Sequence, residues 1–433
     1  RCQVAVFDGG LSYTLIEAID LTDIRLVYAP PRAIGEFGGE PDNFRWPRHV
    51  GDFAVARAYK DGKPYRPEFY FPLSNEGVKS GDFVMVLGYP GRTFRSLTAA
   101  EMENDHDNFE RRASLYGEWI KLLELTSEGN AAGKITIAAT LKSLNNANTN
   151  AQGQLEGLVR GKLVAKQKSA DDAVVAWAES RMPQALAAKK ELDRLALEAK
   201  QSAPRSYLLS TASSGSIALR DALTIVRLAA QRTLADTARD AAYQERNWKT
   251  LRSTLELSNQ RYFAASDQAL FLAWVNRALK LDQKIQAVNT AFDTSKAKQQ
   301  TTAMLQSTRV TDATERLKMF DESIESLHAR KDPLLEFAFA LDTELKAYQA
   351  NQQALTGAIA RLRPEWRRAV IAHAGTPVAP DANSTLRVSF AHVEGYSPRD
   401  GVYNTAQSTL AGMLEKDTGE EPFAVPALIR EAA

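Results

Sequence analysis

Residues 52–57 (DFAVAR) and residues 81–91 (GDFVMVLGYPG) decide the first step of the fold prediction. Each stretch places an aspartate before a short run of apolar, often β-branched or aromatic, side chains, and Gly and Pro follow the second run. Such runs between turn residues are typical of short β-strands. Runs of the same kind occur at 2–7, 24–28 and 386–390. We therefore expect a barrel or sandwich of short strands rather than a doubly wound sheet.

The composition is that of an ordinary globular protein, and it excludes several partners. The chain has 433 residues, 44% hydrophobic and 25% charged, with 54 Lys+Arg against 53 Asp+Glu. A net charge of +1 gives no reason to expect nucleic acid as a partner, and no apolar run is long enough for membrane insertion. The single cysteine, Cys2, excludes a disulfide within the chain, and we expect a buried structural thiol there.

The middle of the chain changes to a helical pattern at Thr98. Thr98 and Glu101 have the spacing of a capping box, and the following sequence is rich in Ala, Leu, Lys, Glu and Gln. Apolar residues step by three and four at Leu270, Trp274, Ala278, Leu281, Ile285, Val288 and Phe292. This spacing predicts a helix with one apolar face. We therefore expect a region 1–97 of strands, an all-α region 98–372, and a return to β structure over 373–433.

Asp52 is the first candidate catalytic residue. On its own, an aspartate that opens a strand is a turn or cap residue. Taken with residues 81–91, however, the order and spacing resemble the first barrel of chymotrypsin-like serine peptidases. In those enzymes such an aspartate orients the catalytic histidine. His49 lies three residues before Asp52, and we interpret it as a structural neighbour rather than as the triad histidine.

A closer resemblance covers the whole chain. The sequence is similar to the bacterial serine dipeptidyl-peptidases of the dipeptidyl-peptidase 7 and 11 type. The stretches that carry this resemblance are 24–31 (IRLVYAPP), 34–39 (IGEFGG), 42–49 (DNFRWPRH), 88–93 (GYPGRT), Asn146, Asn150, Gly153, Gly157, Leu158, Tyr403, Thr409, Gly412, Glu415, Lys416, Thr418, Gly419, Pro422 and Phe423. The resemblance implies an α+β fold, a chymotrypsin-like double β-barrel interrupted by a large inserted all-α domain that caps the cleft.

The resemblance also implies roles for particular residues. Asp52 falls on the triad aspartate, and Asn43 falls on an asparagine that binds the substrate's free α-amino group. Phe44 takes the place of a neighbouring aromatic residue that lines the same end of the cleft. Asn146 or Asn150 fits a further asparagine, from the helical domain, that contacts the amine. From the residues alone, Asn43 also fits a turn residue, and Asn146 and Asn150 a polar helix face.

The implied activity is the release of dipeptides from the free N-terminus of oligopeptides by a Ser-His-Asp triad. The triad histidine is expected before residue 1 and the serine after the Pro422-Phe423 region, so we interpret the chain as an internal fragment that is inactive alone. No nucleophile loop of the Gly-x-Ser-x-Gly kind occurs, and Ser216 is interpreted as a helix N-cap.

The remaining expectations concern cofactors, assembly and location. We predict no metal and no organic cofactor, because no histidines have metal-site spacing. Related enzymes suggest a homodimer, and a parent protein with a signal peptide that is periplasmic or exported. Two other functions stay open at this point: a chymotrypsin-like endopeptidase with a helical insertion, and a catalytically degenerate helical interaction protein.

Overall fold

The computed structural model describes residues 2–43 and 45–432, and the chain divides into two compact units. The β-rich unit comprises Arg1–Arg95 and Pro380–Ala433, and the helical unit comprises Ser96–Ala379. Two distant segments of the sequence thus build the β-rich unit, and one continuous segment builds the helical unit. That the helical segment caps a cleft stays a prediction.

The β-rich unit contains short antiparallel strands in four small sheets. Its strands are β1 (Cys2–Phe7), β2 (Ser12–Glu17), β3 (Asp23–Tyr28), β4 (Val55–Lys60), β5 (Lys63–Pro64), β6 (Phe83–Gly88), β7 (Arg387–His392), β8 (Tyr396–Arg399) and β9 (Val402–Asn404). The sheets are β1–β2, β3–β4–β5, β6–β7 and β8–β9. None of them closes into a barrel within the described residues, so the predicted double barrel is not confirmed. Four short helices accompany them: α1 (Arg32–Gly35), α2 (Gly39–Asp42), α15 (Leu410–Glu415) and α16 (Ala427–Ala432).

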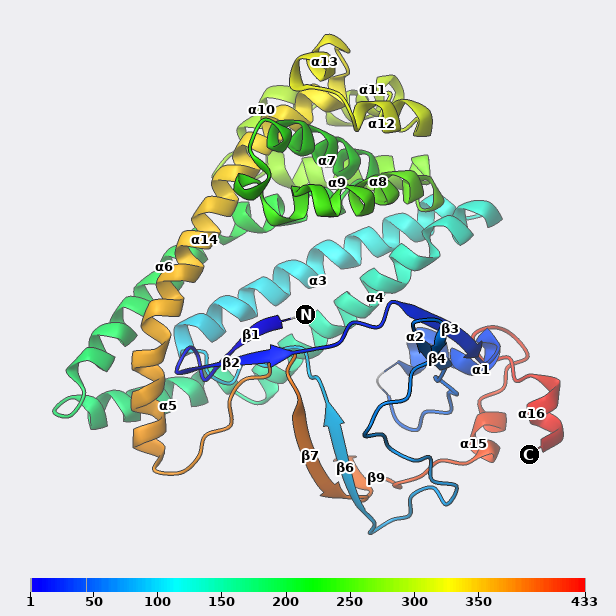
Figure 1. Ribbon diagram of the computed structural model, residues 1–433, viewed down its shortest axis with the longest axis vertical. Coiled ribbons are helices and arrows are strands. Elements are labelled where there is room, and N and C mark those ends of the chain that lie inside the picture. The colour runs from blue at the N-terminus through cyan, green and yellow to red at the C-terminus, as the bar shows by residue number, and fades with distance from the viewer. Residues whose placement is uncertain (1, 44, 433) are drawn as a thin grey trace. The chain divides into compact units, whose positions relative to one another are not determined.

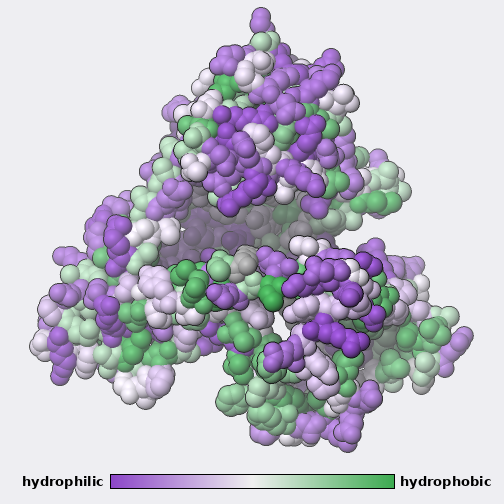
Figure 2. Space-filling view, viewed as in Figure 1, coloured by the Kyte–Doolittle hydropathy of each residue, from purple (hydrophilic) through white to green (hydrophobic). Residues whose placement is uncertain are grey.

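Strand β7 joins the late β segment to the early one. It pairs with β6 in antiparallel register from Phe83↔His392 to Gly88↔Arg387. Side chains on both strands, among them Met85 and Phe390, are exposed, and apolar atoms gather over these strands in Figure 2. Cys2 is exposed too, so the expected buried thiol was wrong. The reason is that β1 pairs only with β2 and little packs over its faces.

The helical unit begins at the predicted capping box. Thr98 accepts a hydrogen bond from the backbone N–H of Glu101, and the Glu101 carboxylate accepts one from the backbone N–H of Thr98. Both bonds satisfy donors that a helix start leaves unpaired, which confirms the prediction. The helices are α3 (Ala99–Ser127), α4 (Ala131–Arg160), α5 (Leu163–Ala178), α6 (Pro183–Thr211), α7 (Ile217–Arg232), α8 (Trp248–Leu257), α9 (Ala264–Leu279), α10 (Gln286–Ala291), α11 (Ala297–Ser307), α12 (Ala313–Met319), α13 (Ile324–Ala329) and α14 (Pro333–Ala374).

The core of the helical unit is large and apolar. Trp119, Phe271 and Trp274 are almost fully buried, and Trp274 donates its indole N–H to the carbonyl oxygen of Leu208 at 2.9 Å. Helix α14 runs beside α6 and also contacts α7 (Figure 1). Apolar faces of several helices therefore meet in one cluster, as the helical periodicity predicted.

One predicted helix is broken in the structure. The apolar positions from Leu270 to Phe292 are buried or partly buried, but α9 ends at Leu279 and α10 begins only at Gln286. Groups from other helices satisfy backbone atoms at this break. Arg205 donates to the carbonyl oxygen of Lys284 at 3.1 Å, and Glu344 accepts from the N–H of Ala287 at 2.8 Å. Tertiary hydrogen bonds thus replace the helical ones that continuous periodicity predicts.

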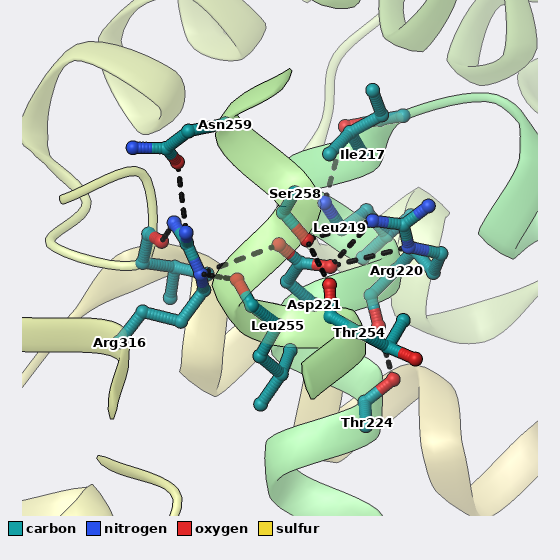
Figure 3. Close-up of polar contacts among 12 residues, drawn as sticks. Ile217, Leu219, Arg220, Asp221, Thr224, Thr254, Leu255, Ser258, Asn259 and Arg316 are labelled. Carbon is teal, nitrogen blue, oxygen red and sulfur yellow. Dashed lines mark hydrogen bonds and ion pairs between the residues drawn. The ribbon is translucent and has the colours of Figure 1, made fainter. Parts of the chain in front are cut away.

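A polar cluster is buried beside this core, and Figure 3 shows its members. Asp221 lies 2.9 Å from the Arg220 guanidinium and 3.6 Å from that of Arg316. Arg316 also donates to the carbonyl oxygen of Leu255 and the side chain of Asn259. Buried charges are tolerated when they are paired and hydrogen-bonded, so this cluster accounts for Arg316 being 1% exposed.

Candidate active site

The loop between β3 and β4 carries two of the predicted site residues, Asn43 and Asp52. Its ends are fixed by the antiparallel pairing of these strands, for example Leu26 with Ala56. The short helices α1 and α2 lie within the loop. Both ends of the loop therefore continue into paired strands of one sheet, while other contacts position its middle.

Asp52 lies at the end of this loop, shortly before β4 begins. Gly51 donates its backbone N–H to the carbonyl oxygen of Ile34 at 2.9 Å, and a Cβ on Gly51 would lie 2.7 Å from the Ile34 side chain. This close approach sets the backbone that carries Asp52. The Asp52 side chain is exposed and has no hydrogen-bond partner among the described residues. Its carboxylate is thus free to accept a hydrogen bond from a further group.

His49 and Asp52 do not form a hydrogen-bonded pair among the described residues. No hydrogen bond joins the two side chains in the described part of the chain, and His49 Nδ1 is buried without a partner there. The ring packs on Gly412, where a Cβ would lie 2.6 Å from Nε2. Burial lowers the pKa of His49, and the nearby Lys416 ammonium lowers it further. These contacts agree with a structural role for His49.

Asn43 is the C-cap of helix α2, and its side-chain oxygen Oδ1 is available to accept a hydrogen bond. Its backbone N–H donates to the carbonyl oxygen of Glu40 at 3.2 Å, and its Nδ2 donates to the Glu40 carboxylate at 3.4 Å. Its Oδ1 has no hydrogen-bond partner among the residues that the structure describes. That oxygen can therefore accept from a donor such as an ammonium group. The neighbouring site residue, Phe44, lies outside the described residues.

The segment before Asn43 contains two glycines, Gly38 and Gly39, that belong to the stretch 34–39 of the family resemblance. Gly38 has φ +82° and donates its N–H to the carbonyl oxygen of Pro422 at 2.9 Å. A Cβ on Gly38 would lie 2.5 Å from Asp42 Oδ2, and one on Gly39 would lie 2.9 Å from Pro422 Cβ. Glycine is needed at both positions because the φ values are positive and the neighbours approach closely.

Asn146 and Asn150 belong to the helical unit. Both lie on α4, four residues apart and so on the same helix face, and both are exposed. Neither side chain makes a hydrogen bond to any described residue. Of the predicted site residues that the structure describes, two lie in the β-rich unit and two in the helical unit.

Comparison with known proteins adds a decisive observation. The family model for peptidase S46 matches residues 1–433 of the sequence. The chain belongs to the peptidase S46 family. The resemblance predicted from the sequence motifs is thereby confirmed.

Relatives of this S46 chain carry dipeptidyl-peptidase names. The Asp/Glu-specific dipeptidyl-peptidase of Shewanella putrefaciens is 32% identical over 100% of this chain and 62% of its own length. Dipeptidyl-peptidase 7 of Porphyromonas gingivalis is 29% identical over 98% of this chain and 61% of its own. The crystal structure of Porphyromonas endodontalis DPP11 in complex with the dipeptide Arg-Glu matches with a TM-score of 0.80 and 25% identity, covering 100% of this chain and 64% of that one. The chain thus spans less than two thirds of these relatives.

One group of side chains in the S46 chain resembles a metal site, but an ammonium already occupies its neighbourhood. Ligand atoms of His106, Asp107 and Glu110 lie within 4.8 Å of one another. His106 Nδ1 faces Asp107 at 3.2 Å, and the Lys200 ammonium lies 3.3 Å from Asp107. The Lys200 ammonium therefore already places a positive charge beside this group. The prediction that the protein uses no metal stays a prediction.

Sequence reasoning missed two residues that contact the loop. Lys416 and Gly412 were part of the family resemblance, yet no role was assigned to them. In the structure Lys416 contacts Asp42 and Pro47, and Gly412 contacts His49. Their position in the late segment, more than 360 residues from the loop, gave no local signal of these contacts.

Proposed function

We propose that this chain is the part of a serine dipeptidyl-peptidase that carries the triad aspartate and the groups that bind the substrate's amino terminus. The observation that carries the proposal is the S46 family match over the whole chain, together with the dipeptidyl-peptidase names of its relatives. No described helix combines the length and apolarity needed to cross a bilayer.

In the proposed mechanism, Asp52 accepts a hydrogen bond from the triad histidine and fixes its orientation. The histidine takes the proton of the serine hydroxyl as the serine attacks the carbonyl carbon of the second substrate residue, and Asp52 stabilises the imidazolium. The exposed Asp52 carboxylate, which has no partner among the described residues, supports this role. We place the histidine and the serine outside these 433 residues, because the sequence contains no recognisable nucleophile loop.

The second part of the proposal concerns the free amino terminus of the substrate. Asn43 Oδ1 accepts from the ammonium group, and Asn146 or Asn150 supplies a further amide oxygen. Neutral amide oxygens suit this role because an ammonium has three donors and no acceptor. An acetylated amine has lost its charge and two of these donors, so the amide oxygens that accept from the ammonium would be left unpaired.

Fold, assembly and location complete the proposal. We assign the strands of the β-rich unit to a chymotrypsin-like double barrel that further sequence completes, with the helical unit as the inserted cap. The enzyme is proposed to be periplasmic or exported and to act as a homodimer. Both of these points rest on the family resemblance, and size measurement of the complete protein tests the second.

The test of Asp52 uses the complete protein with a matched control. Asp52→Asn should lower kcat by about 10⁴-fold with little change in the melting temperature, because the histidine loses its orienting acceptor. Asp82 is the control, since like Asp52 it comes directly before a phenylalanine and shortly before or at the start of a strand, and it accepts from the N–H of Lys79 at 2.7 Å. Asp82→Asn should leave kcat within about threefold. Near-normal turnover by Asp52→Asn would refute the assignment.

A second test separates the proposed activity from an endopeptidase. Acetylation of the amino terminus should abolish release of the first dipeptide from an oligopeptide that is otherwise cleaved. The measurement is mass spectrometry of the products from matched free and acetylated peptides. Rapid cleavage of the acetylated peptide would favour an endopeptidase, and cleavage of neither peptide would favour an interaction protein.

A further inference from the structure

One ammonium group from the late segment of the β-rich unit forms hydrogen bonds to residues on both sides of Asn43. Lys416 lies at the end of α15, and its Nζ donates to Asp42 Oδ2 at 2.7 Å and to the carbonyl oxygen of Pro47 at 2.7 Å. Asp42 immediately precedes Asn43, and Pro47 follows it by four residues. A single side chain therefore ties together the two ends of the segment that presents Asn43.

The surroundings make this contact stronger than a surface ion pair. The Lys416 side chain is 24% exposed and that of Asp42 is 12% exposed. Water screens such a pair less than it screens an exposed one, and hydrogen bonds between charged groups are stronger than neutral ones. The loop also has apolar support, because Phe37 packs with Met413 and Val425 from the late segment. Ser408 adds a hydrogen bond to the carbonyl oxygen of Arg48 at 3.2 Å.

Asn43 itself has little that fixes its amide. Within the described residues its side chain makes one hydrogen bond, the 3.4 Å contact to Glu40. The position of its Oδ1 is therefore set mainly by the backbone on either side. Because Lys416 holds the Asp42 side chain and the Pro47 backbone carbonyl, any shift of Lys416 should move the amide oxygen.

We propose that Lys416 is a positioning residue for substrate binding, one that holds Asn43 where it can accept from the substrate's ammonium group. This inference rests on the proposed function and adds a residue to it. Lys416 touches neither the substrate nor the reacting atoms. Asn43 contacts the amine equally in the bound substrate and in the transition state, so loss of Lys416 should change KM more than kcat.

The experiment measures KM and kcat of the complete enzyme with a peptide that has a free amino terminus. Lys416→Met should raise KM about tenfold and leave kcat within about twofold, because binding geometry is lost while the triad stays intact. Lys416→Arg should return KM to within about threefold of the unmutated enzyme, since a guanidinium can donate to both acceptors. A purely structural role would lower the melting temperature and the active fraction but leave KM unchanged.

A matched control breaks a different ion pair of the same segment. Arg430 lies 2.5 Å from Asp417, and neither residue bonds to the described residues 42–43 and 45–49. Arg430→Met should therefore leave KM unchanged. Asp42→Asn removes the charge of the other partner, and the double variant Asp42→Asn/Lys416→Met should raise KM hardly more than Lys416→Met alone. If Lys416→Met does not fold, Asp42→Asn must raise KM by itself.

The outcomes distinguish this inference from the function on which it rests. If Asp52→Asn abolishes turnover while Lys416→Met keeps the KM of the unmutated enzyme, the positioning role is wrong and the proposed function stands. If the unmutated protein does not release dipeptides, the proposed function is wrong and the positioning role with it. Equal rises in KM for Lys416→Met and Arg430→Met would also overturn the positioning role, because the effect would not be specific to the loop.

Discussion

Asp267 is a buried carboxylate whose charge costs stability at neutral pH. It is 4% exposed and accepts from the Ser216 hydroxyl at 2.7 Å and from the N–H of Ile217 at 2.5 Å, at the start of α7. Burial raises the pKa of Asp267 to about 6 from an ordinary value of 3.8, although these hydrogen bonds act in the opposite direction. A raised pKa means that the folded protein holds this proton more tightly than the unfolded chain does.

The sign of the pH effect follows from this difference. The contribution of Asp267 to the free energy of unfolding should fall as pH rises from about 4 to about 6 and stay low above that. Asp267→Asn should therefore gain stability relative to the unmutated protein between pH 4 and pH 7, by on the order of 2 kcal/mol. Urea unfolding of both proteins at the two pH values measures this gain. A difference that stays constant with pH would contradict the prediction.

The site residues show what a sequence can and cannot reveal at this scale. The roles of Asp52 and Asn43 stay predictions, and they come from short stretches whose local order resembles the family's motifs. Ser216 could be interpreted as an N-cap from its local sequence, and its hydroxyl does accept from the N–H of Leu219. Lys416 could not be predicted, because its partners Asp42 and Pro47 are reached only through the tertiary fold.

Helix α4 carries two glycines that cost stability without an apparent packing reason. Gly153 and Gly157 lie on the face of Asn146 and Asn150, and a Cβ on either glycine would meet nothing within 4 Å. Glycine inside a helix is about 1 kcal/mol less favourable than alanine. Gly153→Ala and Gly157→Ala should each raise the free energy of unfolding by about 0.5–1 kcal/mol, measured by urea titration.

The same helix supplies a control for this prediction. At Gly133 a Cβ would lie 2.9 Å from the Phe263 ring, so Gly133→Ala should destabilise the protein. If Gly153→Ala destabilises the protein as much as Gly133→Ala does, the prediction that this face of α4 has room for a methyl group is wrong. If the stabilised variants lose dipeptide release, the face of Asn146 and Asn150 meets the substrate, as the proposed function requires.

At the scale of the elements, the positions of strands and helices could be predicted better than the way in which they pair and break. The runs at 2–7 and 24–28 are strands β1 and β3, and the helix begins at its predicted cap. The pairing of β6 with β7 could not be predicted, because it joins residues about 300 positions apart. The break between α9 and α10 was missed because Arg205 and Glu344, from other helices, satisfy its backbone.

The two units differ in how much apolar surface each buries by itself. The helical unit has a core cluster around Trp119, Phe271 and Trp274, whereas the cluster of the β-rich unit consists of Phe37, Met413 and Val425 with partly buried neighbours. Burial of apolar surface is the main favourable term in folding. The helical unit should therefore be able to fold alone, and the β-rich unit should not.

The prediction at the scale of the molecule is that residues 96–379, expressed alone, form a stable helical protein. Contacts within the unit hold both ends of the segment. Arg363 donates to the carbonyl oxygen of Ser96 at 3.1 Å, and Arg367 donates to that of Ala379 at 3.2 Å. We expect a helical circular dichroism spectrum and one cooperative thermal transition, as in other compact single units. Residues 1–95 alone should show neither, and a broad transition with strong dye binding by 96–379 would refute the prediction.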